Sequence, residues 1–301
     1  METQPHMNTS PDSPATSARP KRRSVLAWSV RDVEQRLGFR GGRHTRVNNT
    51  LALLLATAAT IAVYASLIPL NETWAAEMLT RRGPTPYAIV FLTCWATCVL
   101  LLKSQKVRLQ RRALELSVVP ENHDFVLSAI TVDQVMENIY EKVDDPRHFV
   151  LFNRITLALS NLRNLGRVGD VDEILRSQAA QDESTMETSY ALVRGFVWAI
   201  PVLGFIGTVL GLSQAIGGFG GVLATAEDVG QLGPALREVT GGLSTAFDTT
   251  LEALVAALLI QLAMTFLKKS EEEFLDECTE YCNHSVVSRL KMTLYEEAVT
   301  P

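Results

Sequence analysis

The sequence predicts an all-α integral membrane protein with four transmembrane helices, a helical cytoplasmic domain and long helices that extend into the cytoplasm. Three observations support this class. The chain of 301 residues is only 47% hydrophobic overall, but its apolar residues gather in four runs of the length that spans a bilayer. Basic residues cluster beside these runs. The remaining segments carry apolar residues at helical spacing.

The first two spans form a hairpin. Residues 51–70 are twenty uncharged residues in a row, enough to cross a hydrocarbon core about 30 Å thick at about 1.5 Å per residue. This run is too long for the apolar part of a secretion signal, so we expect a retained helix. Residues 86–102 supply the second span, which opens on a proline and an interfacial tyrosine. We assign the transmembrane hairpin to residues 49–103.

The last two spans lie within residues 192–267. No charged residue occurs in 195–226, which places the third span there. The fourth span, about 241–267, is as apolar but contains the carboxylates Asp248 and Glu252.

Basic residues set the orientation of the spans. Lysine and arginine are concentrated before the first span, after the second and after the fourth, and segments of this kind stay in the cytoplasm. The connections 71–85 and 217–240 carry few basic residues, so we expect them to face outward. Both termini are therefore expected in the cytoplasm, with membrane lipid around the spans.

Two different segments precede the first span. Residues 1–23 are rich in Pro, Ser and Thr and are predicted to be disordered. Residues 24–48 form a basic amphipathic segment. Its apolar residues recur at helical spacing: Leu26, Val30, Val33 and Leu37. This pattern fits either an interfacial helix or a short helix packed on the cytoplasmic domain.

The cytoplasmic part comprises residues 104–191 and the C-terminal segment 268–301. We predict a helical domain in the first, and in the second a helix that continues the fourth span. The apolar stripe of that helix needs a partner to cover it. Cys278, Cys282 and His284 lie near one another, but cysteines on an apolar stripe are usually buried small residues, so no metal site is predicted.

The sequence contains no motif of an enzyme active site. A glycine-rich phosphate loop, an HExxH motif and a GxSxG motif are all missing from the chain. We therefore predict that the protein is not an enzyme and uses no cofactor, and we expect no nucleic-acid partner.

The third span combines glycines, a proline and a threonine. Gly204, Gly207 and Gly211 fall three and four residues apart, a spacing that lets helix backbones approach closely in lipid. They predict a tight helix contact. Pro201 should bend the helix and free a carbonyl that protein or water must satisfy. Thr208 either bonds back to its own helix or points into a polar lumen.

A polar stripe runs down the fourth span. Thr245, Asp248 and Glu252 recur three and four residues apart, with Thr249 at the edge. An ionised carboxylate near the bilayer centre costs about 2.5 to 3.5 kcal/mol on insertion scales, so such residues usually face a bundle interior or water. The alternative is a shifted boundary, in which the span begins near Ala246 and Asp248 lies at headgroup level.

These two helices resemble the MotA/TolQ/ExbB proton-channel family. The segments PVLGFIGTVLGL at 201–212 and AFDTTLEALVAAL at 246–258 look like the family's proline-led GxxGTVxG helix and its following A-L-x-T-T-x-x-G/A-L-x-x-A helix. The resemblance covers about residues 185–270. The layout of the whole chain is similar to the four-span flagellar-stator branch, whereas the motif itself is closer to the ExbB and TolQ branch.

The resemblance implies a subunit of a proton-driven motor in a bacterial inner membrane. In the family, five copies form a ring whose third and fourth helices line a pore. Two single-span partners of the MotB/ExbD/TolR type occupy that pore, and a partner aspartate carries the proton. For this chain the resemblance implies a homopentamer with two copies of such a partner. The glycines would allow a tightly packed ring.

The resemblance also implies which residues line the pore. The family's threonine on the first motif helix falls on Thr208, and the one on the second falls on Thr250, or on Thr249 if the register slips by one. Where ExbB-like members carry a glutamate five residues before the second threonine, this chain has Thr245.

The two carboxylates have no counterpart in that motif. Asp248 and Glu252 lie about 160° from Thr250 on an ideal helix. This position allows a contact with a neighbouring subunit, and it leaves open whether they replace the missing glutamate. Two other functional classes stay open as well. A non-conducting scaffold would need spans but no polar stripe, and a secondary transporter would normally show internal repeats.

Overall fold

The computed structural model describes residues 25–39, 41–70, 72–80, 83–120, 126–128, 130–165, 168–225 and 232–290. Over these residues the chain is helical, with two isolated β-bridges and no strand. The predicted all-α class is therefore confirmed. The segment 1–23, predicted to be disordered, lies outside the described residues, as does the end of the C-terminal segment from residue 291 onward.

Ten α-helices and three short 3-10 turns are named in the described part of the chain. In order they are α1 (Trp28–Arg31), α2 (Val33–Arg36), α3 (Asn49–Leu67), η1 (Ile68–Leu70), α4 (Trp74–Thr80), α5 (Thr85–Leu114), α6 (Val132–Lys142), η2 (Pro146–His148), α7 (Val150–Leu165), α8 (Val168–Ser189), α9 (Ala191–Thr225), α10 (Leu232–Ser285) and η4 (Val287–Arg289). Four of these helical stretches are long and apolar enough to cross a membrane, namely α3, α5, the α8–α9 rod and α10. They are the four spans that the sequence predicts.

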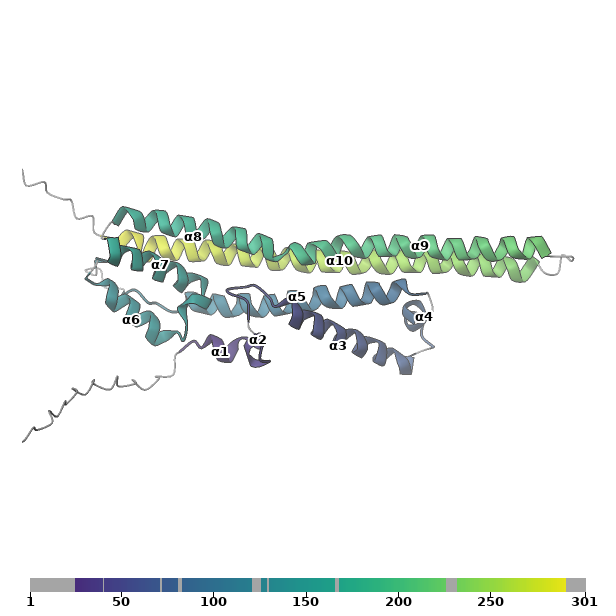
Figure 1. Ribbon diagram of the computed structural model, residues 1–301, viewed down its shortest axis with the longest axis horizontal. Coiled ribbons are helices and arrows are strands. Elements are labelled where there is room, and N and C mark those ends of the chain that lie inside the picture. Colours follow the sequence, from purple (N-terminus) through teal and green to yellow (C-terminus); the bar gives the residue numbers. More distant parts are fainter. Residues whose placement is uncertain are drawn as a thin grey trace, which may run out of the picture.

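The molecule is elongated around one antiparallel helix pair. Figure 1 shows α10 running along nearly the whole length, with α9 and then α8 beside it. The helix α5 packs on this pair, and α3 packs on α5 at the outside. The helices α6 and α7 lie at one end of the molecule, with α1 and α2 between this end and the middle, and we call this part the basal end. At the opposite end, α9 and α10 project beyond α3, α4 and α5.

The connection between the third and fourth spans contains helical extensions of both. We expect it at 217–240, and within this range α9 continues to Thr225 and α10 starts at Leu232. The sequence permits this extension because the only proline in that region, Pro234, falls in the first turn of α10, where the helix has no hydrogen bond to lose.

The basal part of α10 continues the fourth span and is covered by the helical domain. Phe274, Cys278 and Cys282 are buried against that domain, and both cysteines are free thiols. They join a core that includes fully buried residues of α6 and α7. These residues are Val135, Ile139, Phe152, Ile155 and Leu159. The stripe on the C-terminal helix therefore has the partner that its apolar pattern requires.

The segment before the first span packs on the helical domain rather than forming one amphipathic helix. It makes two single turns, α1 and α2, and Val30 remains 67% exposed while Trp28 is buried. The backbone N–H groups of Trp28 and Ser29 donate to the carboxylate of Asp144 at 2.9 and 3.1 Å. Burial alone would raise the pKa of Asp144, but these N–H donors lower it below its usual value. The sequence allowed an interfacial helix or a short helix packed on the cytoplasmic domain. The structure shows the packed arrangement.

Buried ion pairs tie the helices together where the spans enter the basal end. Lys103 of α5 lies 3.0 Å from Glu271 of α10, and Lys106 lies 2.6 Å from Glu34 of α2. All four side chains are almost completely buried. These lysines follow the second span in the sequence, where they mark its orientation, and the structure adds that they are fixed inside the protein.

Candidate functional site

The glycines of α9 form a close contact with α10 of the same chain. A methyl group at Gly204 would lie 2.5 Å from the Cβ of Ala253, and one at Gly207 would lie 2.7 Å from the Oγ1 of Thr249. At Gly211 the nearest atom would be the carbonyl oxygen of Gly242 at 3.1 Å. The predicted tight helix contact is therefore present, and it lies inside one subunit.

The helix α10 contributes small residues of its own to this contact. A methyl group at Gly242 would meet the Cβ of Ala215 at 2.5 Å and the carbonyl oxygen of Gly211 at 2.9 Å. Ala246 and Ala253 continue the same strip and are buried. Small residues recur there at helical spacing, so the sequence contains a signal for this face of α10 as well.

A pair of threonine hydroxyls crosses the α9–α10 contact one turn from these glycines. The Oγ1 of Thr208 is in direct hydrogen-bond contact with the Oγ1 of Thr250. Thr250 Oγ1 also lies 3.1 Å from the carbonyl oxygen of Gly204, and Thr208 Oγ1 lies 3.1 Å from the same oxygen and 3.3 Å from that of Ala246. Each hydroxyl has one proton, so these contacts are alternatives between which the two hydroxyls can switch.

Of the two possibilities that the sequence left for Thr208, the structure shows the bond back to its own helix, at Gly204, and it adds a contact with a second hydroxyl on the facing helix. Both threonines are only half buried in the single subunit. Part of each threonine is therefore exposed in the single chain.

Thr249 occupies a different position from Thr250. It is 1% exposed, and its hydroxyl donates to the carbonyl oxygen of Ala246 at 3.0 Å. Its side chain fills the space beside Gly207, where Thr85 at the start of α5 also arrives. Thr249 thus packs between helices and has no free hydroxyl for a lumen. Nothing in the sequence singled out Thr85, because a lone threonine before a span is common.

The remaining residues of the polar stripe are spread over the surface of α10. Thr245 is half buried, and its hydroxyl donates to the carbonyl oxygen of Gly241 at 3.0 Å. Asp248 is half buried, with the hydroxyl of Ser244 at 3.4 Å from its carboxylate. Glu252 differs from Asp248, because both of its carboxylate oxygens are buried within the chain.

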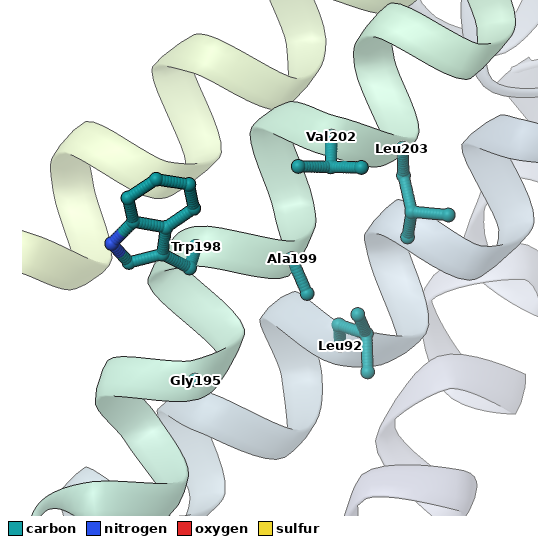
Figure 2. Close-up of a pocket in the computed structure, with 6 residues that line it drawn as sticks. All are labelled: Leu92, Gly195, Trp198, Ala199, Val202 and Leu203. Atoms are coloured by element: carbon teal, nitrogen blue, oxygen red, sulfur yellow. The ribbon is translucent and has the colours of Figure 1, made fainter.

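Pro201 lies inside α9, which continues as a helix on both sides of it. The same stretch of α9 forms an apolar groove with α5. Figure 2 shows the groove residues, which are Leu92 of α5 and Gly195, Trp198, Ala199, Val202 and Leu203 of α9. Trp198 is 77% exposed, and its ring nitrogen is the only polar side-chain atom in this set. This face suits lipid or another apolar helix rather than an ion.

Comparison with known proteins gives one match. Residues 153–280 match the model of the MotA/TolQ/ExbB proton channel family. The matched range runs from α7 through α9 into the basal part of α10, and it includes the glycine contact and the hydroxyl pair. It does not include the hairpin α3–α5. No curated protein and no solved structure matches the chain. The protein is therefore a multi-pass membrane protein, and its residues 153–280 are similar to the MotA/TolQ/ExbB proton channel family.

Proposed function

We propose that this chain is a subunit of a proton-driven motor complex in a bacterial inner membrane. The complex couples proton flow to mechanical work through a single-span partner of the MotB/ExbD/TolR type. The observation that carries the proposal is the contact between Thr208 and Thr250, the two positions at which the family motif places its pore threonines. Secondary-transporter and scaffold functions gain no comparable support from the described residues.

A hydroxyl pair suits proton conduction in a membrane for a physical reason. A hydroxyl both donates and accepts a hydrogen bond, so it can accept a proton from one water while it releases its own proton to another, and it is neutral before and after the transfer. A neutral group also avoids the insertion cost of a carboxylate or an amine in the spans. In the proposed complex Thr208 and Thr250 orient water beside the carboxyl group of the partner, and that carboxyl group carries the proton.

A single subunit supplies too little polar surface for a conducting path, which supports a shared pore. Large apolar side chains of α9 and α10 are exposed in the isolated chain. They include Phe205, Ile206, Val209, Phe247, Leu251 and Leu254. We propose that neighbouring copies, two partner chains and lipid cover these side chains, in a homopentameric ring closed by rotational symmetry.

We propose that the basal end lies in the cytoplasm together with both termini. The two ends of the described chain support this orientation, because Leu26 pairs with Val143 and Leu290 pairs with Leu127 at the same helical domain. The basic residues that follow the second and fourth spans lie at this end as well, in agreement with the positive-inside rule.

Proton flux measured on paired variants tests the proposal. The complex, purified with its partner, is reconstituted in liposomes that contain a pH-sensitive dye, and a potassium gradient drives proton entry. Thr208→Val combined with Thr250→Val keeps the side-chain shape and removes both hydroxyls, so we expect flux to fall to background while the complex stays assembled.

Thr57→Val in α3 is the matched control. The Thr57 hydroxyl bonds only the carbonyl oxygen of Leu53 in its own helix, so its loss should leave the flux at the wild-type level. Full flux through the Thr208/Thr250 double variant would remove the hydroxyl pair from the ion pathway. Flux that depends on an added solute rather than on the partner would point to a transporter.

A further inference from the structure

Glu252 lies in a membrane span with its charge-bearing atoms sealed inside the subunit. Both carboxylate oxygens are buried and have no hydrogen-bond partner among the described residues. Because the chain's own helices bury them, a neighbouring copy or a partner protein cannot pair with them in an assembly. Any hydrogen-bond or ion-pair partner of Glu252 must therefore come from its own subunit.

A second unpaired polar group lies near this carboxyl group. The hydroxyl of Tyr64 on α3 is also buried without a hydrogen-bond partner in the described structure, and it is close enough to Glu252 for the two groups to interact electrostatically. The ring of Tyr64 stacks on that of Tyr87 of α5, with the ring centroids 4.7 Å apart. The hydroxyl of Tyr87 is used elsewhere, since it donates to the carbonyl oxygen of Thr80.

No basic group in the membrane part of the subunit can neutralise Glu252. Lysine, arginine and histidine are all missing from 49–70, 85–102, 195–226 and 239–267. The other ionisable groups near the pair are Tyr87 and Cys94 of α5, and one turn back along α10 lies the acidic Asp248. Every neighbour is thus neutral or acidic, and none favours an ionised Glu252.

An ionised carboxylate without a hydrogen bond or a counter-charge is strongly disfavoured in an apolar interior. The protonated form avoids this penalty, because a carboxylic acid and a phenol each have one donor and at least one acceptor and can satisfy each other. We propose that Glu252 and Tyr64 form a proton-binding site inside the membrane part of each subunit, in which Glu252 holds the proton at neutral pH.

This site is separate from the hydroxyl pair. Thr250 faces Gly204 of α9, whereas Glu252, two residues further on, lies about 160° around the helix from Thr250 and approaches Tyr64 of α3. The bound proton is therefore in the wall of the subunit and not on the line between Thr208 and Thr250. The site lies partly outside the family match, because Tyr64 precedes residue 153.

Infrared spectroscopy of the full chain in lipid tests the site directly. A protonated carboxyl group gives a C=O band that is separate from the bands of carboxylates and that moves in deuterated water. We expect wild-type protein at neutral pH to show this band and Glu252→Gln to lack it. Loss of carboxylate bands instead, in the same variant, would mean that Glu252 is ionised and would overturn the proposal.

Four further samples make the result independent of any one variant. Wild-type protein that contains carboxyl-labelled [13C]glutamate should show the acid band shifted, which needs no substitution. Asp248→Asn should leave the band in place. Tyr64→Phe should shift its frequency, whereas Tyr87→Phe should not, and an unchanged band in Tyr64→Phe would contradict the pairing. The experiment does not measure flux, so the site and the motor function can fail separately.

Discussion

At the scale of single residues, the same side chain has different roles according to its position in the bundle. Thr57 and Thr93 bond only the carbonyl oxygen four residues earlier in their own helices. Thr249 is a buried spacer beside Gly207, and among the threonines of the described spans only Thr208 and Thr250 join hydroxyls across two helices. The role of a threonine in a membrane span therefore depends on which helix faces it. Here glycines allow the facing helix to come close.

The close contact at Gly207 predicts a large effect of a small substitution. In Gly207→Ala the new methyl group would lie 2.7 Å from Thr249 Oγ1 and 2.9 Å from Thr85 Oγ1, so α9 must move away from its neighbours. We expect a loss of about 1–3 kcal/mol, the usual cost of overpacking. Thermal denaturation of the purified protein in mild detergent measures this loss.

Gly217→Ala provides the comparison for that variant. It places the same methyl group on the same helix, but nothing lies within 4 Å of it, so the melting temperature should stay at or slightly above that of the wild type. Equal melting temperatures for the two variants would show that the α9–α10 contact is looser than described.

The carboxylate of Asp248 offers a second prediction at this scale. Asp248 is half buried in the single chain, so neighbouring copies or water can reach it, and Asp248→Asn removes its charge while keeping its shape. We expect proton flux in liposomes to fall at least several-fold. Flux at the wild-type level would place Asp248 at the headgroup boundary, where a charge costs little free energy. Asp248 would then have no role in the ion pathway.

At the scale of elements, hydrophobic periodicity predicts the helices well and their mutual packing poorly. The four spans and the extension of α10 follow from uncharged runs and an apolar stripe. The ion pair between Lys103 and Glu271 joins residues 168 positions apart. No local sequence pattern predicts a contact over this separation. The same limit applies to the segment before the first span, where Asp144, more than a hundred residues away, fixes the first turn.

The hydroxyl pair shows how far the candidate site is predictable. The resemblance to the family motif placed Thr208 and Thr250 in corresponding positions, and the structure brings their hydroxyls together. Reasoning from residue types alone left Thr208 undecided, because the outcome depends on which face of α10 meets α9. The burial of Glu252 beside Tyr64 was not predictable either, since it depends on how α3 packs in the bundle.

The pair Lys103–Glu271 predicts a strong coupling between α5 and α10. Lys103 also donates to Ser189 at 2.7 Å, and the Tyr190 hydroxyl donates to Glu271 at 2.8 Å. In Lys103→Met the carboxylate stays buried without its cation, so we expect a loss of about 3–5 kcal/mol, measured by thermal denaturation in detergent.

A second substitution separates pairing from packing. In Lys103→Met combined with Glu271→Gln the stranded charge is gone, so most of the stability should return. Lys269→Met, which removes an exposed lysine paired with Glu273, should change stability by less than about 1 kcal/mol. A double variant as unstable as Lys103→Met would mean that Lys103 acts through packing rather than through its charge.

At the scale of the whole molecule, one chain has the parts of a channel wall but not a channel. The α9–α10 pair is well packed inside and apolar outside, and its two facing hydroxyls belong to half-buried threonines. Its far end projects beyond α3, α4 and α5 (Figure 1), which leaves α9 and α10 free of these three helices there. These features favour a ring in which copies of the pair line a shared pore around a partner.

Native mass spectrometry of the complex, extracted gently from the membranes of its own host, tests the central claim most directly. We predict five copies of this chain together with two copies of a small single-span protein that carries an aspartate in its span. A monomer or dimer without such a protein, found both in mild detergent and in lipid discs, would contradict the proposed motor.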